Sequence, residues 1–61
     1  MEKEIFEWIT KIIATCAHDF HFEAVDKLIM LYQQRFDNEA NVVELKKMRQ
    51  DKWNEIHVIL N

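Results

Sequence analysis

The chain has 61 residues, a net charge of −3 and neither glycine nor proline. A β-rich fold of this length needs tight turns that glycine supplies, so the composition argues against strands and predicts an all-α chain. Hydrophobic residues make up 49% of the sequence, which argues against disorder. Mixed charges without a basic stripe argue against nucleic acid or an anionic membrane surface as a ligand.

The first predicted element is an amphipathic helix over residues 2–18. Acidic side chains at Glu2 and Glu4 suit the positive end of a helix dipole. The acidic start lacks the apolar core of a signal peptide, so we expect a cytoplasmic protein with a reduced cysteine. No apolar run reaches the roughly 18 residues of a membrane span. The apolar residues fill about half of the helix circumference: Ile5, Phe6, Trp8, Ile9, Ile12, Ile13, Cys16 and Ala17.

The second predicted helix covers residues 22–36. Its apolar row has spacings of 3, 4, 3 and 4, as in a short coiled coil: Phe22, Val25, Ile29, Tyr32 and Phe36. Extending the apolar row of the first helix forward lands on Asp19, Glu23 and Asp26 instead. This mismatch of phase indicates a break at residues 18–21 with Asp19 as the N-cap, and the alternative is one long kinked helix over residues 2–36.

The third predicted helix covers residues 41–60. Asn41 followed by Glu44 matches a capping box. Two cations, Arg49 and Lys52, fall inside the apolar arc of this helix. Either their stems extend to the surface, or they pair with acidic residues of a neighbouring helix or subunit, or they lie on an open face that meets an acidic partner.

The stretch CAHDFHF, residues 16–22, raises the question of a metal site. Cys16, His18 and His21 have ligand chemistry, but no second pair of ligands follows at the spacing of a known zinc motif. Ile12 and Ile13 lie four and three residues before Cys16, so its helical neighbours are apolar. A catalytic thiolate needs a more exposed and electropositive setting. We therefore favour a structural corner, expect no cofactor and no enzymatic activity, and keep a metal- or redox-sensing peptide as the alternative.

The arrangement that these features predict is a single domain over residues 1–61. It is a small three-helix bundle, a helical hairpin plus a third helix. The first two helices each have a wide apolar arc, more than one copy of so short a chain can bury, so we expect a homodimer.

The function that this sequence favours is a non-enzymatic protein–protein interaction module, a regulator, adaptor or inhibitor of the kind found among bacterial or phage accessory proteins. A structural subunit that folds only within a larger assembly is a further alternative. The residues that we expect at the partner interface are large apolar side chains and the two cations: Trp8, Phe20, Phe22, Met30, Arg49, Lys52, Trp53 and Ile56.

Overall fold

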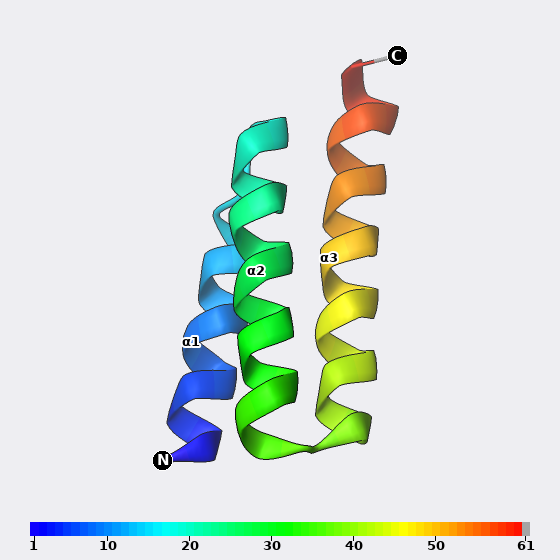
Figure 1. Cartoon of the computed structure of the whole chain (residues 1–61). Coiled ribbons are helices and arrows are strands. Elements are labelled where there is room, and N and C mark those ends of the chain that lie inside the picture. The colour runs from blue at the N-terminus through cyan, green and yellow to red at the C-terminus, as the bar shows by residue number, and fades with distance from the viewer. Residues whose placement is uncertain (61) are drawn as a thin grey trace.

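Three helices run alternately up and down in the computed structural model, which describes residues 1–60 and the side chains of residues 1–57 (Figure 1). They are α1 (Glu2–Ala14), α2 (Asp19–Phe36) and α3 (Glu39–Leu60). The bundle measures 37 × 17 × 16 Å. The predicted all-α three-helix bundle is confirmed, and the dimer stays a prediction.

The core lies between the three helices and draws on each of them. Its fully buried members are nonpolar apart from the Tyr32 hydroxyl and the Cys16 thiol: Ile9, Ile13, Cys16, Phe22, Val25, Ile29, Tyr32, Val42 and Leu45. Full burial of one such large side chain contributes about 1.5–3 kcal/mol. Phe22 is only 2% exposed, so its expected place at a partner interface is corrected to a place in the core.

The first connection begins earlier than the sequence predicts, because α1 ends at Ala14 and not at residue 18. The Thr15 amide donates to the Ile12 carbonyl, and its hydroxyl donates to the same oxygen at 2.9 Å. The Ala17 amide then donates to Nδ1 of His21 at 3.2 Å. These bonds satisfy backbone groups that the end of the helix leaves unpaired. A break between the first two helices is therefore confirmed, although it covers residues 15–18 and not the predicted 18–21, and the single kinked helix is wrong.

The start of α2 also differs from expectation. His18 is the N-cap residue, with extended φ and ψ of −135° and 156°, and Asp19 is the first helical residue. The predicted N-cap role of Asp19 is thus wrong by one position. Its carboxylate still lies in the first turn, where the helix dipole favours negative charge.

The second connection consists of Asp37 and Asn38 alone. Asp37 adopts the left-handed conformation (φ 48°, ψ 41°), which aspartate tolerates better than most residues. The Asn38 side-chain oxygen accepts the Asn41 amide at 3.2 Å and so caps α3. The predicted capping box of Asn41 and Glu44 is wrong, because the helix begins two residues earlier, at Glu39.

Candidate protein-binding surface

Large apolar side chains are exposed along the side of the bundle where α1 and α2 meet. Two rows of side chains follow helical spacing there. The first consists of the N-cap residue Met1 and of Ile5, Trp8 and Ile12 on α1. The second consists of Phe20, Ala24, Leu28 and Leu31 on α2. We call these eight residues the α1–α2 face. Within the described part of the chain, it includes four of the six large apolar side chains that are exposed, Met1, Trp8, Phe20 and Leu31.

Two small hollows follow the seam of this face. One holds about 100 Å³ between Ile5 and Trp8 of α1 and Leu28 and Leu31 of α2, with Arg35 at its edge. The other holds about 120 Å³ and is lined by residues on both sides of the first connection, among them Ile12, Cys16, His21 and Ala24. Sites for small molecules usually enclose 300–1,000 Å³. Hollows of this size fit single side chains of a partner better than a whole substrate.

The predicted interface residues of the first two helices divide between this face and other parts of the surface. Trp8 and Phe20 belong to the α1–α2 face, with 53% and 64% of their surfaces exposed. Met30 is also exposed, but it lies on α2 away from the seam. Leu31 was not among the predicted interface residues, and it is 56% exposed on the α1–α2 face. The apolar row of α2 that predicts the core lies next to it, and the sequence alone does not show that Leu31 stays outside that core.

Arg49 and Lys52, the two cations in the apolar arc of α3, are both paired within the chain. Arg49 forms an ion pair with Asp26 of α2 at 2.9 Å, and its guanidinium lies 5.2 Å from the centre of the Phe22 ring. Lys52 reaches Glu55 of its own helix at 3.9 Å. Of the three readings of these charges, pairing with an acidic residue of a neighbouring helix is confirmed for Arg49.

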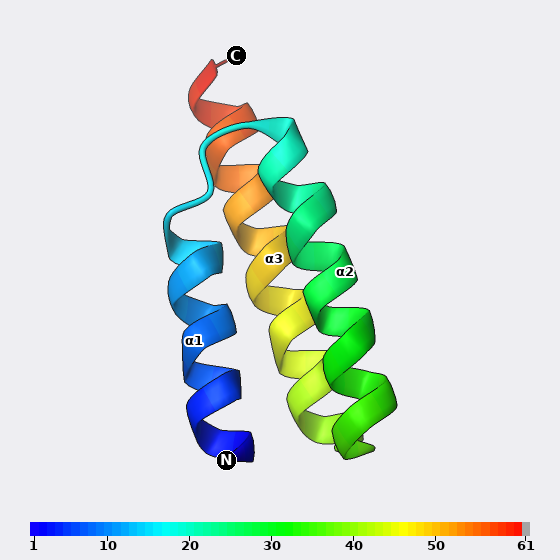
Figure 2. The same ribbon diagram turned by 60° about the vertical axis from the view of Figure 1, so that its left-hand side comes forward.

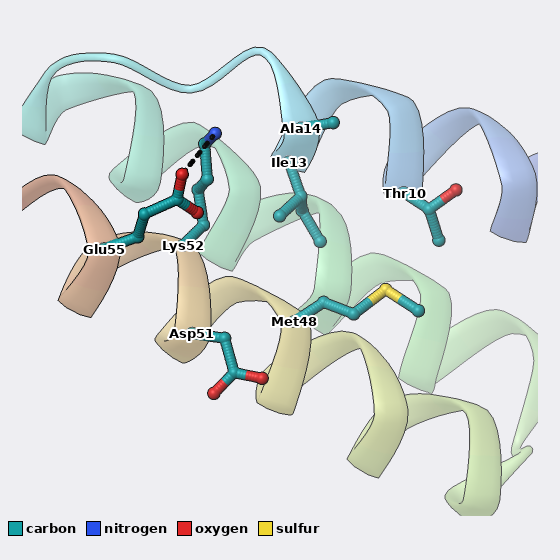
Figure 3. A pocket seen from close by; sticks show the side chains of 7 residues that line it. All are labelled: Thr10, Ile13, Ala14, Met48, Asp51, Lys52 and Glu55. Atoms are coloured by element: carbon teal, nitrogen blue, oxygen red, sulfur yellow. Dashed lines mark ion pairs between the residues drawn. The ribbon is translucent and has the colours of Figure 1, made fainter.

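A larger hollow of about 350 Å³ lies between α1 and α3 (Figure 3). Ile13 and Met48 provide its apolar part, while the Lys52–Glu55 pair and Asp51 stand on its α3 side. Its cation and one of its carboxylates already neutralise each other. None of the six large apolar side chains that are exposed in the described part of the chain lines this hollow, whereas four of them belong to the α1–α2 face.

Trp53 and Ile56 are partly buried and pack against the core. The Trp53 ring stacks on His57, with 3.8 Å between ring centres. His57 in turn lies 3.5 Å from Asp19 at the start of α2. Of the two tryptophans, Trp8 is therefore the one that the fold leaves on the surface.

Cys16 belongs to the first connection and is buried, with 4% of its surface exposed. Its Sγ donates to the Ile12 carbonyl at 3.4 Å, and burial raises the pKa of the thiol. Within the described part of the chain, no three His, Cys, Asp or Glu side chains form a group that could hold a metal ion. His21 instead uses Nδ1 to accept the Ala17 amide.

A polar cluster that the sequence did not reveal joins the three helices at the opposite end of the bundle. Glu2 accepts hydrogen bonds from Tyr32 at 2.6 Å and from Asn38 at 2.7 Å, and Asn41 donates to the Tyr32 hydroxyl at 2.9 Å. These bonds, led by that of Tyr32, lower the pKa of Glu2. Burial and the Glu2 carboxylate raise the pKa of Tyr32. The cluster accounts for these groups structurally, since each one has a partner within the chain.

No protein-family model matches the chain, and no curated protein or solved structure is significantly similar to it. Among the described helices, none is long and apolar enough to span a lipid bilayer.

Proposed function

We propose that the protein is a non-enzymatic interaction module, a small regulator, adaptor or inhibitor, and that the α1–α2 face binds a helix of its partner. One observation carries the proposal: Trp8, Phe20 and Leu31 of the α1–α2 face are each more than half exposed. Apolar side chains gathered in this way mark interaction surfaces, and tryptophan is among the strongest anchors of such contacts.

The arrangement of the helices explains why this face is available. α3 packs along one side of the α1–α2 pair (Figure 2). The two small hollows of the α1–α2 face are lined by no residue of α3, so α3 leaves this face uncovered. The spacing of 4, 3 and 4 residues along α1 and of 4, 4 and 3 along α2 suits the ridges of an added helix. Binding there would turn the three-helix bundle into a four-helix one.

A cytoplasmic setting belongs to the same proposal, because a single buried thiol has no partner within the chain for a disulfide. The partner is either another protein or a second copy of this chain, the homodimer that the sequence predicts. Both would cover the same apolar rows, so the choice between them depends on the charges around the face.

The experiment that tests the proposal is site-specific photo-crosslinking in lysate of the source organism. A photoreactive phenylalanine analogue replaces Leu31 on the face, and in the matched control it replaces Val43 on α3, which is exposed to a similar degree (61% against 56%). We expect a discrete crosslinked species from position 31 that is absent from position 43. Equal crosslinking from both positions, or none from either, would overturn the proposal.

A further inference from the structure

We infer that the helix bound by the α1–α2 face carries carboxylates beside its apolar stripe, opposite the cations of α2, an inference that rests on the proposed function. The reason is the charge around the face. Lys27 and Arg35 lie four residues before and after Leu31, and on α1 Glu4 and Lys11 lie four before and three after Trp8. Glu23 likewise lies three residues after Phe20 of the same face. Side chains at these separations are neighbours on a helix, so these five residues form a rim beside the apolar rows.

The rim carries three cations and two carboxylates, a net of +1, whereas the whole chain has −3. The surplus lies on α2, because Glu4 and Lys11 balance each other on α1. Among the described side chains, the ion pairs join other residues, Arg49 with Asp26 and Lys52 with Glu55. The His57 ring lies 3.5 Å from the Asp19 carboxylate. Arg35 lies at the edge of the seam, with its guanidinium 5.7 Å from the Phe36 ring. The cations of the rim are therefore available to a partner, and carboxylates are the complementary groups.

A second copy of the chain fits this rim less well. A two-fold contact places the face against itself, so both sides bring the same surplus of positive charge. Like charges facing each other across an interface oppose association, and acidic flanks on a different protein remove that opposition. The rim thus favours another protein over the homodimer.

Calorimetry with two synthetic helical peptides tests the inference. Both peptides have about 18 residues and the same leucine stripe at spacings of 3 and 4, long enough to follow α1 and α2. Glutamates flank the stripe in one peptide, and lysines flank it in the other. We expect the glutamate peptide to bind about tenfold more tightly at low salt, and this ratio to shrink at about 0.5 M salt.

Charge-reversal variants assign that preference to the rim. Lys27→Glu combined with Arg35→Glu should reverse the order of the two peptides. Lys46→Glu combined with Lys47→Glu makes the same change of charge at exposed positions of α3, and it should leave the order unchanged. Leu31→Ala should weaken both peptides about tenfold, because it removes part of the shared apolar contact.

Each other outcome overturns a specific part of the inference. If both peptides bound with equal affinity and Leu31→Ala weakened both, the preference for carboxylates would be wrong, and the helix-binding face would remain. No binding of either peptide up to about 1 mM removes the helix-binding function itself. A native mass that doubles with concentration, except in Leu31→Ala, makes a second copy the occupant. Binding to phosphatidylserine-containing vesicles in place of the peptides makes the occupant a membrane surface.

Discussion

Arg49 of α3 and Asp26 of α2 form a two-pronged ion pair, with Nε 2.9 Å from Oδ1 and Nη2 3.1 Å from Oδ2. The same guanidinium covers the ring of Phe22 in the core. One side chain thus joins two helices by charge and also shields an aromatic ring from water. This explains how a cation occupies the apolar arc of α3 without being buried unpaired.

A double-mutant cycle of Arg49→Ala and Asp26→Ala should give a coupling energy of about 0.5–1 kcal/mol by urea unfolding. The value is modest because the side chains of the pair are 23% and 53% exposed to water. Arg49→Ala alone should cost more, about 1–2 kcal/mol, because the loss of its stem also uncovers Phe22. A coupling that does not decrease at about 0.5 M salt would contradict a solvent-exposed pair.

The cluster around Glu2 predicts a loss of stability in acid. Hydrogen bonds from Tyr32, Asn38 and Asn41 lower the pKa of the folded Glu2 carboxyl below its ordinary value. The unfolded chain then binds more protons in acid, so the stabilisation is complete above the unfolded pKa of about 4.3 and is lost as the pH falls through the folded pKa. Unfolding in urea at several pH values measures this loss.

The variant Glu2→Gln separates this effect from that of the other acidic residues. Between about pH 5 and pH 3 its stability should fall less steeply than that of the native chain. Tyr32→Phe should show the same smaller slope, and it should also lose about 1 kcal/mol at neutral pH because Asn41 and Glu2 lose a partner. If stability depended on pH in the same way in all three proteins, protonation of Glu2 would not contribute to the loss of stability in acid.

The left-handed residue Asp37 provides a test of the second connection. Asp37→Asn keeps a residue that tolerates positive φ and removes a negative charge from the C-terminal end of α2, so it should stabilise the fold by about 0.3 kcal/mol. Asp37→Val should destabilise it by about 1–2 kcal/mol, because a branched Cβ crowds the backbone there. Thermal unfolding of both variants checks this order, and equal melting temperatures would contradict it.

The helices were predictable because the information for them is local. The absence of glycine and proline, the change of phase after Cys16 and the polar residues before the third apolar row predict three helices and two breaks. The ends of the helices depend on single hydrogen bonds, such as that of His21 to Ala17 and that of Asn38 to Asn41. Several nearby residues could form such bonds, so three of the six predicted ends differ from the observed ones by two to four positions.

The candidate surface was predictable only in part, because a wide apolar arc does not reveal which of its flanks meets a neighbour. Trp8 was selected for its size and its place at the edge of its arc, and it lies on the face. Leu31 follows the buried Ile29 by two residues, so it lies on another side of α2, and only the packing of the helices shows that this side stays exposed. The Glu2 cluster joins residues 30 to 39 positions apart, and no local pattern indicates such contacts.

The variant His21→Ala decides between a structural corner and a metal site in CAHDFHF. We expect it to lose about 1 kcal/mol, since the Ala17 amide loses its acceptor, and to do so equally with and without zinc. A metal-sensing role requires that zinc raise the melting temperature of the native chain and not that of the variant. Circular dichroism with zinc or a chelator distinguishes the two outcomes.

The two tryptophans test whether the α1–α2 face serves the fold or a partner. Trp8 is about half exposed, so Trp8→Ala should change the free energy of unfolding by less than about 1 kcal/mol. Trp53 packs against the core and His57, so Trp53→Ala should cost about 2–3 kcal/mol. Binding of the glutamate peptide should show the opposite order. Trp8→Ala should lose this binding, and the folded variant Trp53→Phe should keep it. If Trp8→Ala destabilised the chain as much as Trp53→Ala, the indole would be a core group, and the apolar face would lose its strongest anchor.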